Sequence, residues 1–298
     1  MSTIDSTGVH VGDAEGITEY TARAGEECIQ NSRIDKSDVE LLINTSIFRE
    51  DNIVEPSMAT LIQKEMELNL DPMNEGETYE SPTFVLDLMN GANGFLNAAK
   101  VAEGMIKSGR VDNVLVVGGE SHPSGEEKDD FPYSHSGAAA LFVPSGGENR
   151  RGFGSYSFGM PGSELDEAMS GLDLSQHGGK GRDMIEVERP DNFEEKLRRR
   201  MVDKIEDYLD AESLETDDID GLIVNQPEAG FARSVAEGAG IDPSAAVDTY
   251  GEYGDTNSAS PFIGYHEGIE RGVFGDGDRI LFVTGTIGLS LACGHYVV

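Results

Sequence analysis

The sequence has few cysteines, few basic residues and no long apolar run. It contains only Cys28 and Cys293, far apart and outside any CxxC motif. This argues against a disulfide framework or a thiolate metal site and favours a reducing cytoplasm. No segment approaches the roughly 18 apolar residues of a membrane span, and the N-terminus lacks the apolar core of a signal peptide. We therefore expect a cytoplasmic protein without a membrane partner.

Basic residues are scarce relative to acidic ones. The chain of 298 residues holds 22 Lys and Arg against 56 Asp and Glu, a formal net charge of −34. Such a charge repels nucleic acids and anionic membrane surfaces, which excludes them as partners. The acids are spread along the whole chain and 38% of the residues are hydrophobic, so a disordered acidic tail is not indicated. We expect a folded protein with an acidic surface, as in salt-adapted organisms, and so a halophilic protein. Molar salt screens the repulsion between surface carboxylates over about 3 Å, which removes its destabilising effect on the fold.

Motifs for metals and nucleotides are also missing. The six histidines form neither HExxH nor another close ligand spacing, and no GxGxxG or GxxxxGK[ST] follows an apolar run. The sequence therefore predicts no metal site and no cofactor.

Apolar, β-branched runs alternate with helical patterns along the chain. Each run has four to eight residues and is apolar on both faces, which is typical of central strands covered by helices. The alternation predicts an α/β layered fold. The expected strands are 39–46, 83–89, 113–119, 139–144, 221–226, 279–286 and 289–298, and the expected helices are 16–33, 56–67, 92–108, 193–212, 229–238 and 258–271.

Three short sequences recur in the same order at a nearly constant offset. DVELLIN from Asp38 resembles DIDGLIV from Asp218, and EGMIKSG from Glu103 resembles EGIERG from Glu267. DNVLVVGG from Asp112 likewise resembles DRILFVTG from Asp278. This pattern predicts a duplicated α/β half. We divide the chain into an N-terminal half (1–145), a Gly-rich connecting or lid segment (146–190) and a C-terminal half (191–298).

The repeats, with LDLMNGANGF before LNAAKVAEGMIKSGRVDNVLVVGGES, then LIVNQPE and GDTNSAS, resemble the thiolase superfamily and its ketoacyl synthase III-like branch. The resemblance covers nearly the whole chain and is most specific over 83–120. It implies a five-layered α/β/α/β/α fold made of two similar halves. Before the segment matching EGITEYTARAGEECI the family has a further strand and loop, which this chain either lacks or builds differently.

The family condenses acyl thioesters with a Cys nucleophile, a His and an Asn. The resemblance places the Cys at Ala92, the His at Asn225 (NQPE) and the Asn at Asp255 (GDTNS). All three are replaced. Asn257 takes the third role only if the local alignment slips.

Serine, histidine and cysteine residues elsewhere in the sequence are the other candidate nucleophiles and bases. Ser121 and His122 lie in a segment that superficially matches GxSxG, but Pro123 stands where the closing Gly is needed. Ser134, His135 and Ser136 are adjacent, so they do not point at one another. Cys28 and Cys293 are expected to be core residues.

The resemblance also indicates a binding pocket. Backbone N–H groups at Ala92 and at the turn from Gly285 to Gly288 match the family's oxyanion hole, which does not depend on side chains. The remaining candidate substrate-binding residues are Asn93, Gln226, Glu228 and Asn257, with helix capping as the equally weighted alternative for these polar residues.

We predict a catalytically silent ketoacyl synthase III-like subunit, which binds an acyl thioester of CoA or acyl carrier protein or supports an active condensing partner. The alternative is an enzyme acting on acyl thioesters without a covalent nucleophile, with Asp255 or Glu228 as general base. By the same resemblance we expect a homodimer or a heterodimer with a thiolase-like subunit, paired through the apolar strand NVLVVGG.

Overall fold

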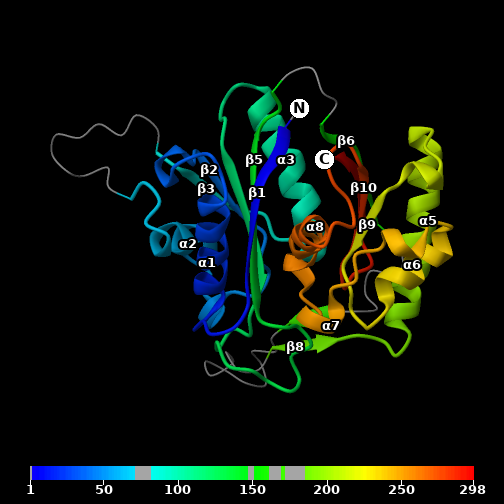
Figure 1. Cartoon of the computed structure of the whole chain (residues 1–298). Helices are drawn as coiled ribbons and strands as arrows, with labels where there is room; N and C mark the ends of the chain where they lie inside the picture. Colours follow the sequence, from blue (N-terminus) through cyan, green and yellow to red (C-terminus); the bar gives the residue numbers. More distant parts are fainter. Residues whose placement is uncertain (1, 71–81, 147–150, 161–168, 172–184) are drawn as a thin grey trace.

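Five layers make up the molecule (Figure 1). The computed structural model describes residues 2–70, 82–146, 151–160, 169–171 and 185–298. A first sheet has the order β1-β5-β4-β2-β3 and a second the order β6-β11-β10-β9. The predicted thiolase-like α/β/α/β/α arrangement is confirmed.

The strands of the first sheet are β1 (Ser2–His10), β2 (Leu41–Asn44), β3 (Phe84–Asp87), β4 (Val114–Glu120) and β5 (Ser136–Pro144). Those of the second sheet are β6 (Gly152–Gly159), β9 (Gly221–Val224), β10 (Arg279–Gly285) and β11 (Leu291–Val297). A small ladder joins β7 (Met169–Gly171) to β8 (Glu186–Glu188).

The helices occupy three layers. Helices α1 (Ile17–Gln30) and α2 (Met58–Glu65) cover the outer face of the first sheet, and α3 (Gly94–Lys107) and α8 (Ser260–Glu270) lie between the sheets. Helices α5 (Phe193–Glu212) and α6 (Phe231–Ala239) cover the outer face of the second sheet, and α7 (Tyr250–Tyr253) is a single turn. Within the described residues no helix is long and apolar enough to cross a membrane.

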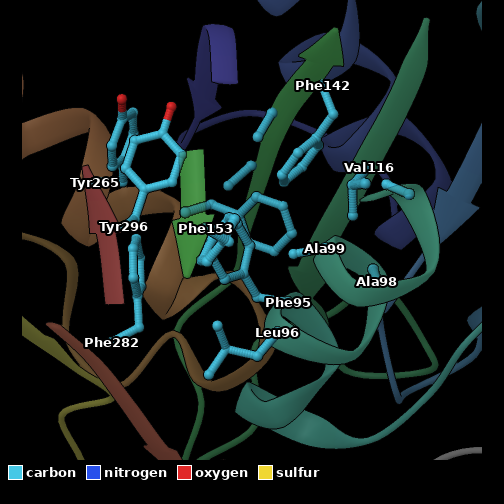
Figure 2. Packing of buried hydrophobic residues seen from close by; sticks show 14 of the residues in the cluster. Phe95, Leu96, Ala98, Ala99, Val116, Phe142, Phe153, Tyr265, Phe282 and Tyr296 are labelled. Atoms are coloured by element: carbon cyan, nitrogen blue, oxygen red, sulfur yellow. The ribbon is translucent and has the colours of Figure 1, made fainter. Parts of the chain in front are cut away.

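Strand periodicity assigns the core residues to the layers. In β4, Val114 and Val116 face the central helices, whereas Leu115 and Val117 pack with α1 and α2. Successive side chains of a strand point to opposite faces, so both faces of β4 must be apolar. Figure 2 shows the central layer, where Phe95 of α3 meets aromatic rings of the second sheet and of β5.

The duplication is visible in local structure. A capping box formed by Asp35 and Asp38 precedes β2, and one formed by Glu215 and Asp218 precedes β9. Each fixes a short 3-10 turn, Lys36–Asp38 (η1) and Thr216–Asp218 (η6), and thereby the direction in which the chain enters its strand.

Two expectations change in the structure. The strand expected to pair with a partner, NVLVVGG, is β4, which is hydrogen-bonded on one side to β2 and on the other to β5. That prediction was wrong, because a central strand has no free edge. The family's first strand is not missing, since Ser2–His10 forms β1 antiparallel to β5.

The connecting segment 146–190 lies partly outside the described residues. Its described part supplies β6, which pairs with β11 and so extends the second sheet.

Candidate functional site

The turn at the end of β3 is fixed by a buried aspartate. Asp87 accepts hydrogen bonds from Arg49 Nη2 at 2.8 Å and from the backbone N–H groups of Met58 and Ala59 at 3.0 and 2.8 Å. It therefore ties the strand to the N-terminus of α2 and positions the residues that follow.

The chain then enters α3 through a 3-10 turn, Gly91–Asn93 (η3). Gly91 has φ +50°, and a Cβ there would lie 3.3 Å from Thr286 Cγ2 and 3.4 Å from Asn257 Oδ1. Glycine is required because the backbone is left-handed and the space is closed. Ala92, the next residue, is fully buried and presents only a methyl group.

The side chain of Asn93 forms hydrogen bonds with residues of the C-terminal half. Its Nδ2 donates to the carbonyl oxygen and hydroxyl of Ser290, both at 3.1 Å, and its Oδ1 accepts from Thr284 Oγ1 at 2.7 Å. These bonds join the turn of α3 to the β10–β11 hairpin. The Asn93 side chain therefore links the N-terminal half to the C-terminal half.

Asn225 and Gln226, the two predicted residues that follow β9, form hydrogen bonds within the protein. Asn225 Oδ1 accepts the Gly285 N–H at 2.9 Å. Gln226 donates from Nε2 to the Val247 carbonyl at 2.9 Å and accepts the Thr249 N–H at 3.1 Å. Both side chains are buried and hold neighbouring loops in place.

The other predicted binding residues are Gly285, Gly288 and Glu228. The Gly285 N–H donates to Asn225, as described above. Gly288 follows in the β10–β11 hairpin, where the Thr286 N–H donates to the Ser290 carbonyl at 3.0 Å. Glu228 is exposed at the start of α6, outside the buried cluster formed by the other residues.

Asp255 forms a buried ion pair. Its Oδ2 lies 3.2 Å from Arg189 Nη2 and its Oδ1 accepts the Asn257 N–H at 3.1 Å. The guanidinium carbon of Arg189 stacks over the rings of Tyr133 and Phe193 at 5.1 and 5.2 Å. Burial raises the pKa of Asp255 to about 6, and the charge of Arg189 opposes that rise.

Asn257 lies against the Gly91–Asn93 turn that contains Ala92. Its φ is +34°, its Nδ2 donates to Glu120 Oε1 at 2.9 Å, and its Oδ1 lies against Gly91. The amide thus bridges the turn of α3 and the end of β4.

Glu120 was not among the residues predicted from the sequence, and neither was Arg189. Its Oε1 accepts from Asn257 Nδ2, from the Ser258 N–H at 3.0 Å and from the Ser258 hydroxyl, while its Oε2 has no hydrogen-bond partner in the described part of the chain. Burial raises the pKa of Glu120 to about 8. The available signal was the acid that ends the apolar run VLVVGGE, since a charge there must be buried with the strand.

The alternative nucleophiles are not arranged for catalysis. His122 Nδ1 lies 2.7 Å from Ser124 Oγ, and Ser121 Oγ donates to the His122 carbonyl at 3.4 Å, so Ser121 does not face the imidazole. Cys28 and Cys293 are fully buried, as predicted for core residues, and burial raises the pKa of both thiols, that of Cys28 to about 12.

Within the residues that the structure describes, no group of three or more His, Cys, Asp or Glu is placed to hold a metal ion. The polar groups at the predicted positions and their partners are amides, hydroxyls, one ion pair and the buried acid Glu120.

Comparisons with known proteins agree with this geometry. Residues 86–162 match the profile of 3-oxoacyl-[acyl-carrier-protein (ACP)] synthase III, and residues 209–297 match its C-terminal profile. Together they span more than half of the chain.

Full-length relatives show the same similarity. The chain is 23% identical to beta-ketoacyl-[acyl-carrier-protein] synthase III of Aquifex aeolicus, over 91% of this chain and 81% of the relative. It is 25% identical to the protein of that name from Aliarcobacter butzleri, over 91% and 80%. The solved structure of 3-oxoacyl-(acyl carrier protein) synthase III from Pseudomonas aeruginosa has the same fold, with a TM-score of 0.82 at 15% identity over 99% and 98% of the two chains.

Proposed function

Because the chain belongs to the 3-oxoacyl-[acyl-carrier-protein] synthase III family of the thiolase superfamily, we propose that it has lost the condensing reaction. It would serve as a non-catalytic subunit, or acyl-thioester-binding partner, of an active condensing enzyme.

The observation that carries this proposal is the state of the three positions expected to hold Cys, His and Asn. The Ala92 methyl forms no thioester, the Asn225 amide is bonded to the Gly285 N–H, and the Asp255 carboxylate is paired with Arg189. An amide transfers no proton at neutral pH, and a carboxylate opposes an enolate. Acyl transfer through a covalent intermediate has no side chain left to start it.

Within the described residues β3 pairs only with β2, and this edge of the first sheet supports a partner-binding role. The edge strand β3 exposes Phe84, which is 59% accessible, and Met89 just beyond it is 45% accessible. An apolar strand edge with unpaired backbone groups is a template for pairing with a second chain. We propose that β3 pairs either with a second copy or with a thiolase-like chain that carries the missing Cys.

Intact-mass spectrometry tests the loss of acylation. The protein is incubated with acetyl-CoA in molar potassium chloride, beside the Aquifex aeolicus relative as a positive control. We expect no acetyl adduct on this chain. An adduct would overturn the proposal by revealing a nucleophile.

Purification from the host tests the subunit role. We expect a second thiolase-like chain that carries Cys at the position of Ala92 to co-elute at high salt, and Phe84→Glu to release it. A chain that elutes alone as a monomer would contradict this part of the proposal.

A second candidate function rests on Asp255. A buried carboxylate whose pKa is raised to about 6 is suited to accept a proton near neutral pH. The chain would then act on acyl-CoA or acyl-carrier-protein thioesters without a covalent step. Turnover of acyl-CoA by the isolated chain, lost in Asp255→Asn, would favour this function over the first. Glu228, the other acid considered as general base, is exposed and lies outside the buried cluster.

A further inference from the structure

A cavity of about 490 Å³ lies beside the loop that carries Asp255. Ser134 and Gly254 line it, and the Ser134 N–H donates to the Asp255 carbonyl at 2.8 Å. The side chains of Ala92, Asn225 and Asp255 do not line it. The cavity is therefore separate from the substituted positions but in contact with their scaffold.

One side of the cavity is an aromatic wall formed by Tyr20, His135, Phe131 and Tyr133. Neighbouring rings meet at 76°, 70° and 80°, with centroids 6.0, 6.3 and 5.4 Å apart. Rings set nearly at right angles make edge-to-face contacts, so the four rings pack as one aromatic cluster.

The histidine in this wall carries no charge near neutral pH. His135 Nε2 accepts the His122 N–H at 3.3 Å, and burial lowers the pKa of His135. The imidazole of His135 therefore adds no positive charge to the aromatic wall.

Acidic residues also line the cavity. Glu127 and Asp129 line it, are exposed, and form no ion pair within the described part of the chain. The other two charged lining residues are already compensated, because Lys128 pairs with Glu126 at 3.2 Å and Glu252 with Arg271 at 2.9 Å. Two carboxylates thus remain without a counter-charge.

We propose that this cavity binds a small organic cation, such as a quaternary ammonium group, between the aromatic wall and the carboxylates of Glu127 and Asp129. Aromatic faces attract cations most strongly where water is excluded, and the carboxylates add Coulomb attraction. This inference does not depend on the proposed function, since it uses none of the residues on which that function rests.

Calorimetric titration with choline tests the proposal. The comparison ligand is the neutral carbon isostere of choline, in which a carbon atom replaces the nitrogen, so shape is kept and charge removed. In potassium chloride solution we expect choline to bind about tenfold more tightly than the isostere. Equal affinities, or no binding of choline, would overturn the proposal.

Variants identify the site. The exposed double change Glu127→Gln with Asp129→Asn should weaken choline binding about tenfold, and Asp130→Asn in the same loop is the matched control that should not. Phe131→Leu should weaken it as well, with the thermal midpoint recorded to confirm folding. Unchanged affinity in the double variant would place the ligand elsewhere and sink the assignment.

Discussion

The 3-10 turn Gly91–Asn93 that opens α3 can be compared with the turn Asn257–Ala259 (η8) that opens α8, since the two occupy equivalent places in the duplicated halves. Each starts with a residue of positive φ, +50° at Gly91 and +34° at Asn257. The first then presents the Ala92 methyl, whereas the second binds Glu120 through Asn257 and Ser258. The same backbone path thus places a methyl group, that of Ala92, at the second position of one turn and a hydroxyl group, that of Ser258, at the second position of the other.

The two turns differ in their side chains but share their backbone geometry and the apolar packing behind them. The turns touch each other at Gly91 and Asn257, and the helices behind them touch through Phe95 and Phe262, whose ring centroids are 4.7 Å apart. Backbone geometry and apolar packing are present in both halves. In both turns the polar side chains form hydrogen bonds with other segments of the chain.

The largest expected effect comes from the matched phenylalanines. Both are fully buried, so Phe95→Ala and Phe262→Ala should each lower the free energy of unfolding by about 3–5 kcal/mol. The double variant should lose about 0.5–1.5 kcal/mol less than the sum, because the rings contact each other. Urea unfolding in molar salt measures this, with the half-exposed Phe158→Ala as a control that changes little. Strict additivity would show that the two helices are independent.

The ion pair beside the second turn should give the next effect. Asp255→Asn leaves the largely buried guanidinium of Arg189 with Glu194, 4.0 Å away, as its only counter-charge in the described part of the chain, and we expect a loss of about 2–4 kcal/mol of unfolding free energy. Adding Arg189→Met should restore at least half of that loss, as measured by the same urea transitions. No recovery in the double variant would mean that Asp255 stabilises the loop through its Asn257 bond alone.

Glu120, the acid at the end of β4 that the second turn binds, should make stability depend on pH. The pKa of Glu120 is raised from 4.5 to about 8 in the folded protein, so the folded state holds a proton that the unfolded chain releases. Stability should therefore fall as pH rises between these values, by at most about 1.4 kcal/mol per pH unit, and level off above pH 8.

Glu120→Gln, which stays neutral, should flatten this dependence, and unfolding midpoints at pH 7, 7.5 and 8 measure it. Asp255, whose pKa is about 6, titrates below this range, and the lowered pKa values of His135 and His295 place them there as well. The exposed Glu126→Gln is the control. An unchanged slope in Glu120→Gln would assign the effect to another group.

Most of the fold was predictable because its strands are apolar on both faces. The helix expected at 193–212 is α5 with the same bounds, and the predicted strands correspond to β2, β3, β4, β5, β9, β10 and β11. The unpredicted strands have other compositions. In β1 the buried inward positions include Ser2 and Ser6, and β6 reads GFGSYSFG, so neither carries an apolar run.

The candidate site was only partly predictable. The motifs assign Ala92, Asn225 and Asp255 to the family's catalytic positions, which stays a prediction, and the polar partners in this region come from distant segments. Arg189 lies 66 residues from Asp255 and Glu120 lies 137 from Asn257, and nothing local in the sequence links either pair. Long-range polar pairing depends on the assembled layers and cannot be inferred from periodicity.

The smallest expected effect is at the first turn, where Ala92→Cys should restore the nucleophile without restoring condensation. The helix N-terminus favours a thiolate at this position, so a slow acetyl adduct from acetyl-CoA is compatible with the comparison of the turns. Condensation also needs a proton carrier and an enolate-stabilising amide, whereas Asn225 is bonded to Gly285 and Asp255 is paired with Arg189. We expect no 3-oxoacyl product above the wild-type background, measured by mass spectrometry with acetyl-CoA and malonyl thioester, and Ala92→Ser as the control. Product formation by the single variant would show that the polar second turn still supports catalysis, and that only the apolar first turn had lost its chemistry.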